Sequence, residues 1–177
     1  MSRVAKRYAK AVFELAIENK ALEDTEKEFL QIEDSIKGNS ELEDFLVNPL
    51  ISHIKKSKIV EELYKGRVSD LTFRFLILIA KKGRLAALSE IINYFKRFVL
   101  VYRNQVEGEL LSAVSLSGEQ VSQIRKIIEN MTGKVVLLKE KIDADILGGF
   151  VVRVEDKLID MSVRNILEEL KKKLVAG

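Results

Sequence analysis

The stretch NQVEGELLSAVSL, residues 104–116, decides the fold, because the spacing of apolar residues changes there from a helical period to a period of two. Alternate positions from 106 to 116 are apolar or small: Val106, Gly108, Leu110, Ser112, Val114 and Leu116. Glu107 and Glu109 lie between them, as expected of a strand with one buried face. We therefore expect a boundary here, with one domain over residues 1–105 and another over 106–177.

Working back from the boundary, the helical period runs from Val4 to about Gln105. We expect six helices: Val4–Asn19, Leu22–Lys37, a short one that Ser40 caps with Glu43 and Pro49 ends, Ser52–Tyr64, Ser69–Lys82 and Ala86–Arg103. The connections are short, so these helices should pack as a bundle. The expected fold class is mainly α, with a six-helix bundle in the N-terminal part.

Working forward, strands dominate, and the expected element order is β-α-β-β-β-α. The elements after the first strand are a helix from a capping box at Ser117 to Gly133, strand segments at Val135–Leu138 and Ile142–Ile146, a hairpin of Phe150–Val154 with Lys157–Met161, and a helix at Ser162–Val175. The doublet Gly148-Gly149 should break the chain before the hairpin. The C-terminal domain is thus expected to be a small α+β unit.

Composition removes much enzyme chemistry from consideration. The 177 residues contain no cysteine and one histidine, His53, so thiolate nucleophiles, Cys-ligated metal sites and paired-histidine chemistry are excluded. Asp143 and Asp145 lie on one side of an expected strand, where a solvated face explains them better than a metal site does. Neither a phosphate-binding glycine loop nor a nucleophile elbow is present. We therefore expect a protein without catalytic residues, metal or cofactor.

The charges are segregated along the chain although the formal net charge is only +3. Residues 1–13 carry +4, residues 14–44 carry −8, residues 49–105 carry +8 and residues 106–177 carry −1. One interpretation is that charged helix faces neutralise one another on packing. The other is that a polarised surface orients a partner.

Two expected helices carry more apolar surface than one core contact requires. In residues 4–17 the apolar arc covers about 240° of the helical wheel. The helix that contains the run Phe75–Ala80 is apolar almost all round. Both helices would fit a central position in the bundle. Alternatively, they border a groove that receives an amphipathic helix from another protein.

Three sequence blocks resemble one known family. They are RYAKAVF at residues 7–13, FLILIAKKGRL at 75–85, and GGFVVRV at 148–154 followed by DMSVRNIL at 160–167. In this order they are similar to the delta subunit of F-type ATP synthase, the family of the mitochondrial oligomycin-sensitivity-conferring protein. The resemblance spans nearly the whole chain.

The resemblance implies a non-catalytic stator subunit of the peripheral stalk, with no cofactor, metal or small-molecule substrate. The N-terminal bundle would bind N-terminal helices of alpha subunits in grooves that include the first and fifth helices. We expect the groove to be lined by Tyr8, Ala9, Val12 and Ala16 on one side and by Leu76, Ile77 and Ala80 on the other. The C-terminal domain would bind the stalk's b subunits, with Ile166, Leu170 and Leu174 as expected contacts.

The same sequence leaves two other functions open. The basic stretch 49–105 would suit a helical adaptor that binds nucleic acid, although no recognised nucleic-acid-binding signature is present. A hydrolase built around His53 is the third possibility. We expect neither a signal peptide nor a membrane span, and a location on the cytoplasmic face of a bacterial inner membrane through the complex.

Overall fold

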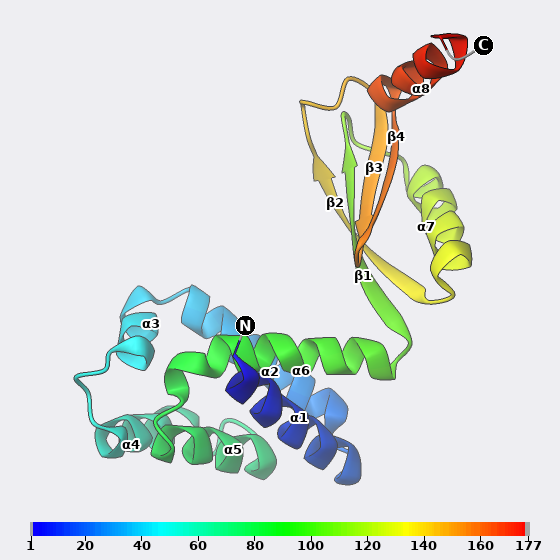
Figure 1. The fold of residues 1–177 in the computed structure, drawn as a ribbon. Helices are drawn as coiled ribbons and strands as arrows, with labels where there is room; N and C mark the ends of the chain where they lie inside the picture. The colour runs from blue at the N-terminus through cyan, green and yellow to red at the C-terminus, as the bar shows by residue number, and fades with distance from the viewer. Residues whose placement is uncertain (1, 176–177) are drawn as a thin grey trace. The chain divides into compact units, whose positions relative to one another are not determined.

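A computed structural model describes residues 2–175 and divides the chain into two compact units, residues 1–99 and 100–177 (Figure 1). The helices that build the N-terminal unit are α1 Arg3–Glu18, α2 Leu22–Lys37, α3 Ser40–Val47, α4 His53–Tyr64, α5 Asp70–Lys81, the 3₁₀ turn η1 Leu85–Ala87, and α6 Leu88–Tyr102. The last residues of α6 lie beyond the division between the units. The expected helical N-terminal part is confirmed.

Polar side chains set the start of most of these helices. The hydroxyls of Ser2, Ser52 and Ser69 accept hydrogen bonds from backbone N–H groups in the first turns of α1, α4 and α5. For α3 the prediction that Ser40 is the cap was wrong. The side chain of Asn39 accepts the hydrogen bond from the Leu42 N–H at 3.1 Å instead, so the helix begins with Ser40 already inside it.

The core of the N-terminal unit is built around aromatic side chains from three helices. Phe29 of α2 and Phe95 of α6 are fully buried, with ring centroids 4.8 Å apart in an edge-to-face arrangement. Phe75 of α5 lies with its ring 5.8 Å from Phe29. The buried carboxylate of Glu33 in α2 pairs with Lys96 of α6 and with Lys37. The aromatic cluster joins α2 to α5 and α6, and the ion pair adds a second contact between α2 and α6.

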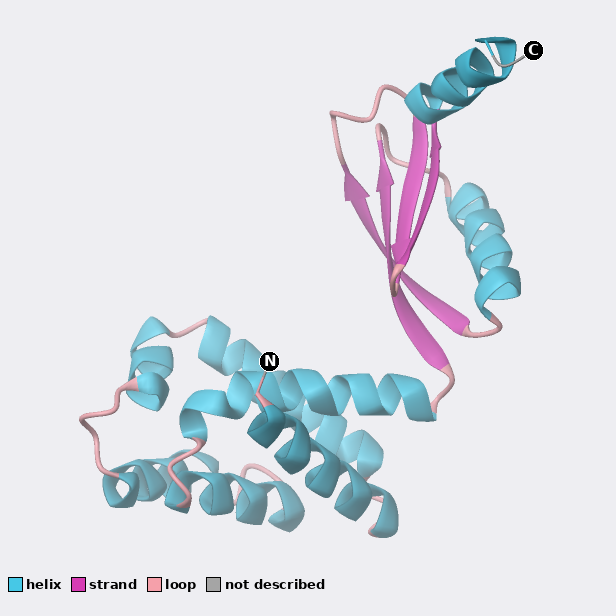
Figure 2. Ribbon diagram, viewed as in Figure 1, coloured by secondary structure: helices cyan, strands magenta, loops and turns pink. Residues whose placement is uncertain are grey.

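The C-terminal unit is a four-stranded sheet with helices (Figure 2). Its elements are β1 Gln105–Ser112, α7 Gly118–Thr132, β2 Val135–Ile142, β3 Gly149–Val154, β4 Lys157–Ser162 and α8 Val163–Val175. The strand order is β2-β1-β3-β4, in which β2 runs parallel to β1 and the other pairs are antiparallel. Ile124 and Ile128 of α7 pack on the sheet over Leu110 and Val152. The predicted order β-α-β-β-β-α and the mainly α class with an α+β part are confirmed.

Two strand boundaries differ from the prediction. The first strand ends at Ser112, because the Ser112 hydroxyl donates to the Val114 carbonyl at 2.8 Å and turns the chain. Val114 and Leu116 therefore do not extend its buried face. The second strand runs unbroken to Ile142, and residues 143–146 lie outside it. The charged stretch Lys139–Lys141 stays in the strand because it pairs with residues 109–111 of β1.

Across residues 2–175, no helix is both long enough and apolar enough to cross a lipid bilayer.

Candidate functional site

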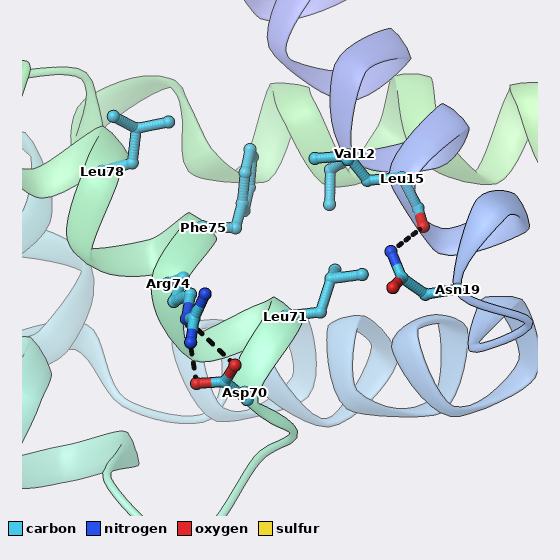
Figure 3. Close-up of a pocket in the computed structure, with 8 residues that line it drawn as sticks. All are labelled: Val12, Leu15, Asn19, Asp70, Leu71, Arg74, Phe75 and Leu78. Carbon is cyan, nitrogen blue, oxygen red and sulfur yellow. Dashed lines mark hydrogen bonds and ion pairs between the residues drawn. The ribbon is translucent and has the colours of Figure 1, made fainter.

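A groove of about 420 Å³ lies between α1 and α5 in the N-terminal unit (Figure 3). Its lining residues are Val12, Leu15 and Asn19 from α1, and Asp70, Leu71, Arg74, Phe75 and Leu78 from α5. These are the two helices whose sequences carry excess apolar surface. The groove therefore lies where the second interpretation of that excess predicted one.

The groove has an apolar floor and exposed apolar edges. Val12 is fully buried and Phe75 is 8% exposed, so these two side chains form part of the core beneath the groove. Leu15 and Leu78 keep 49% and 46% of their surface exposed on the two sides. Covering a leucine side chain fully is worth about 1.5–3 kcal/mol, so a partner that covers both half-exposed leucines gains roughly that much from them together.

One end of the groove is polar. The Asn19 side-chain amide donates to the Leu15 carbonyl at 2.7 Å and thereby closes the last turn of α1. On α5 the Arg74 guanidinium lies 2.9 Å from an Asp70 carboxylate oxygen, one helical turn away (Figure 3). Both members of this pair are largely exposed, so the pair is available to a partner and adds little stability by itself.

Hydrogen bonds from other helices hold both walls. At the start of α5, Ser69 donates from its backbone N–H and its hydroxyl to the Glu28 carboxylate of α2, at 2.6 and 2.8 Å. Before α1, the Ser2 backbone N–H donates to the Glu90 carboxylate of α6 at 2.7 Å. The walls of the groove are thus positioned by α2 and α6 before any partner arrives.

The seven side chains expected to line the groove do not come together on one surface. Five of them are fully buried with no exposed surface: Ala9, Val12, Ala16, Leu76 and Ala80. Tyr8 and Ile77 are half-buried against the core. Of the seven, only Val12 also lines the groove. The four others that are fully buried pack within the bundle, where a docked helix would not contact them in this conformation.

Sequence reasoning missed the residues that form the rim of the groove. Leu15 belongs to the apolar arc of residues 4–17, and Leu71 and Leu78 belong to the apolar α5. Their positions on the helical wheel could have predicted partial exposure. Each leucine lies toward an edge of its apolar arc, next to charged neighbours such as Glu14 or Arg74. In α1 the buried positions are the small residues Ala5, Ala9, Val12 and Ala16, whereas Leu15 reaches the surface.

The C-terminal unit presents a second apolar surface, on α8. The predicted stripe of Val163, Ile166, Leu167, Leu170 and Leu174 is present, and each of its members is at least 44% exposed. Within the described part of the unit, the stripe is not covered by another element. Exposed apolar rows of this length are typical of protein interaction surfaces.

Acidic side chains do not gather into a metal-binding cluster in the residues that the structure describes. Between residues 2 and 175 no group of three or more acidic, histidine or cysteine side chains could hold a metal ion. The Asp143 carboxylate accepts a hydrogen bond from the Asp145 backbone N–H at 3.0 Å, which is a local turn.

A family model described as "ATP synthase delta (OSCP) subunit" matches residues 4–174. The chain belongs to the ATP synthase delta (OSCP) subunit family.

Relatives in bacteria agree with this assignment. "ATP synthase subunit delta" of Lachnoclostridium phytofermentans is 37% identical over 172 residues, which cover 97% of this chain and 94% of the relative. The protein of the same name from Chlorobium chlorochromatii is 36% identical over 173 residues, covering 98% of this chain and 97% of the relative.

Solved structures share the fold. A chain in the cryo-EM structure of the Toxoplasma gondii mitochondrial ATP synthase hexamer matches with a TM-score of 0.72 at 22% identity, covering 99% of both chains. A chain of the Polytomella F-ATP synthase matches 58% of this chain, and 90% of its own length, with a TM-score of 0.54 and 22% identity.

Family membership makes the chain a non-catalytic stalk subunit of F-type ATP synthase, as the sequence predicted. It is a peripheral subunit of that membrane complex.

One of the three sequence blocks that resemble the delta family lies near the C-terminus. It includes Gly148, Gly149, Asp160 and Ser162.

These four residues form the junction between the hairpin and α8. Gly149 has a φ of +79°, and a Cβ there would overlap the Met161 carbonyl. The Asp160 carboxylate accepts a hydrogen bond from the Ser162 backbone N–H at 2.9 Å, and hydrogen bonds from Ser162 lower the pKa of Asp160. The Ser162 hydroxyl accepts from the Asn165 N–H and caps α8. The block thus fixes where α8 starts, and α8 carries the exposed stripe.

Proposed function

We propose that the groove between α1 and α5 receives the N-terminal helix of an alpha subunit of the catalytic head. The α8 stripe, in the same proposal, binds the b subunits of the peripheral stalk. With one unit on the head and the other on the membrane-anchored stalk, the chain resists the torque of the rotor while ATP is made. The observation that carries the proposal is a preformed apolar groove between two helices that other helices already hold in place.

The chemistry of the groove favours an amphipathic helix as the occupant. Its rim offers Leu15 on the α1 side and Leu71 and Leu78 on the α5 side (Figure 3), so a helix lying between them can contact both sides through apolar side chains spaced three and four residues apart. The Asp70–Arg74 pair at one end offers charge to polar side chains of the occupant. Apolar contacts supply affinity, and the polar end supplies orientation.

The α8 stripe favours the same kind of partner in the C-terminal unit. Ile166, Leu170 and Leu174 follow one another at a spacing of four, and each is about half exposed or more. Such a row matches a partner helix that lies along α8. In a bacterial cell, binding to b subunits would keep the chain on the cytoplasmic face of the inner membrane.

Site-directed crosslinking tests the groove, and the absence of cysteine in the chain makes every introduced thiol unique. A cysteine at Leu78 should form a disulfide with a cysteine placed in the alpha N-terminal helix when the complex is oxidised. The matched control is a cysteine at Leu30 of α2, which is similarly exposed but lies outside the groove lining. Equal crosslinking at the two positions would contradict the proposed groove.

A pull-down tests the C-terminal contact. Leu170→Asp in the full chain should abolish retention of the b subunit while leaving the head bound. Leu158→Asp on β4 is the matched control, because Leu158 is exposed to a similar degree and lies off the stripe. Removal of all residues after Asn104 should give the same result as Leu170→Asp. Retention of the b subunit by the truncated chain would contradict the assignment.

A further inference from the structure

Four residues of the stripe on α8 follow the spacing of a coiled coil, and we call them the α8 seam. They are separated by four, three and four residues, which is the alternation of a and d positions in a heptad: Val163, Leu167, Leu170 and Leu174. Each of them is at least 44% exposed. The remaining residue of the stripe, Ile166, occupies a g position beside the seam. α8 therefore presents about two heptads of one side of a helix pair.

The α8 seam is narrow. At about 100° per residue its four members lie within about 60° of the helical wheel, whereas the apolar face of a helix that packs on a core covers about 100° or more. A lipid surface favours aromatic residues on the apolar face, and residues 163–175 contain no phenylalanine, tyrosine or tryptophan. The seam thus favours a single partner helix that lies along α8.

Basic side chains border the seam. Arg164 and Lys171 are exposed and occupy successive e positions, about 70–90° from the centre of the seam. Lys171 forms no ion pair with any side chain that the structure describes. Glu168 and Glu169 lie about 130° from the centre, toward the back of the helix. A helix packed on the seam therefore meets positive charge at the edge of the contact.

The sheet of the C-terminal unit holds the beginning of the seam. The Val163 backbone N–H donates to the Gly148 carbonyl at 3.0 Å. The Asn165 side-chain amide donates to the Asp160 carbonyl, also at 3.0 Å. The first turn of α8 is therefore fixed before a partner arrives, which lowers the entropy cost of binding.

A second copy of this chain is a poor match for the basic border. In an antiparallel pair of α8 helices, e positions face e positions, so Arg164 and Lys171 would lie beside basic residues of the other copy. In a parallel pair, e positions face g positions, and Lys171 would lie beside Ile166. Neither arrangement supplies an opposite charge. A different helix with acidic residues at its own e or g positions does.

We propose that α8 pairs, in coiled-coil fashion, with a partner helix whose heptad seam is bordered by aspartate or glutamate residues. The a and d residues of that helix pack against the α8 seam, and its acidic residues contact Lys171 and Arg164. This inference rests on the proposed function, in which the partner belongs to a b subunit. It adds the packing mode and the charge of the partner surface.

Cysteine scanning along α8 tests the packing mode, because the chain has no cysteine of its own. Single cysteines in the full chain are labelled with a maleimide, alone and in complex with the b subunits. Binding should slow labelling at least about tenfold at the seam positions and leave it within about twofold at three positions on the back of α8: Asn165, Glu168 and Lys172. Uniform protection, no protection, or protection with another period would overturn the proposal.

Charge reversal tests the acidic border of the partner. Full-length Lys171→Glu should bind the b subunits at least about threefold more weakly, because an attraction becomes a repulsion. Lys172→Glu is the matched control: it makes the same change one residue further on, about 170° from the centre of the seam, and should stay within about 1.5-fold. Equal affinities of the two variants would overturn the proposal.

A charge swap tests the same contact from the other side. Carbodiimide crosslinking of the assembled complex should join the Lys171 amine to an aspartate or glutamate of a b subunit. Replacing that acidic residue by lysine should restore the affinity of Lys171→Glu to within about twofold of the wild-type pair. A link to no acidic residue of b, or a swap that restores nothing, would contradict the acidic border.

The variant Leu170→Asp separates this inference from the proposed function. If Leu170→Asp still binds the b subunits, the stripe is not their site and the proposed function of α8 fails. If Leu170→Asp loses them while Lys171→Glu and Lys172→Glu bind equally well, only the acidic heptad partner is wrong. Vesicles of phosphatidylglycerol serve as a further probe. If Lys171→Glu loses vesicle binding but keeps its affinity for b, α8 binds lipid and the proposal is wrong.

Discussion

The Glu28 carboxylate of α2 accepts two hydrogen bonds from Ser69, from its backbone N–H at 2.6 Å and from its hydroxyl at 2.8 Å. Ser69 is also the N-cap of α5, so a residue of α2 fixes the first turn of the helix that forms one wall of the groove. The groove is therefore already shaped in the isolated chain, and its stability is linked to this contact.

Removing the Glu28 carboxylate should loosen α5. We expect Glu28→Ala to lower the free energy of unfolding of the N-terminal unit by about 1–3 kcal/mol, because two part-buried donors of Ser69 lose their acceptor. Urea unfolding measures this difference. Asp34→Ala on the same helix removes an exposed carboxylate and should change stability by less than about 0.5 kcal/mol. Equal effects of the two substitutions would show that Glu28 does not hold α5.

The buried ion pair of Glu33 should make the N-terminal unit sensitive to acid. Burial by itself raises the pKa of Glu33, but hydrogen bonds and positive charge from Lys96 and Lys37 outweigh it and lower the pKa. Since the pKa is lower in the folded state, its contribution to stability is present above the unfolded pKa of about 4.3 and is lost as the pH falls toward the folded pKa.

The measurement is urea unfolding between neutral pH and about pH 3.5, compared with Glu33→Gln. The variant should be less stable at neutral pH by about 1–3 kcal/mol and should lose less stability on acidification. A wild-type chain and a variant with parallel pH profiles would contradict the role of this pair.

A side chain at position 149 should disrupt the C-terminal unit alone. Gly149→Ala places a Cβ against the Met161 backbone at a φ of +79°, so we expect a loss of at least about 2 kcal/mol in that unit. The N-terminal unit has a separate core and should keep its NMR spectrum. Gly118→Ala is the control, because a Cβ at the start of α7 meets open space. Unfolding of both units together would show that they are not independent.

Most of the element order was predictable because local signals agreed with tertiary packing. Ser117 and Gln120 form the predicted capping box, and Gly133 ends α7 in the left-handed conformation. The prediction failed where two neighbouring residues could play the same local role. At the start of α3, Asn39 and Ser40 are adjacent potential caps, and only the structure shows that the Asn39 side chain makes the bond.

The candidate site was predictable to the level of helices but not of side chains. The wide apolar arc of residues 4–17 pointed to α1, which lines the groove, yet Ala9 and Ala16 are fully buried and Leu15 forms the rim. A helical wheel measures the width of an apolar face, whereas the burial of each position depends on where the neighbouring helices lie. That information comes from long-range packing among α1, α2, α5 and α6.

Titration of the full chain with a peptide of the alpha N-terminal helix tests the central claim most directly. Calorimetry should give one binding site, and Leu15→Asp/Leu78→Asp should weaken it by at least about 30-fold, which corresponds to about 2 kcal/mol. The exposed control Leu30→Asp should bind as the wild type does. If the folded groove variant and the control bind the peptide equally well, the groove between α1 and α5 is not where this stator subunit holds the catalytic head.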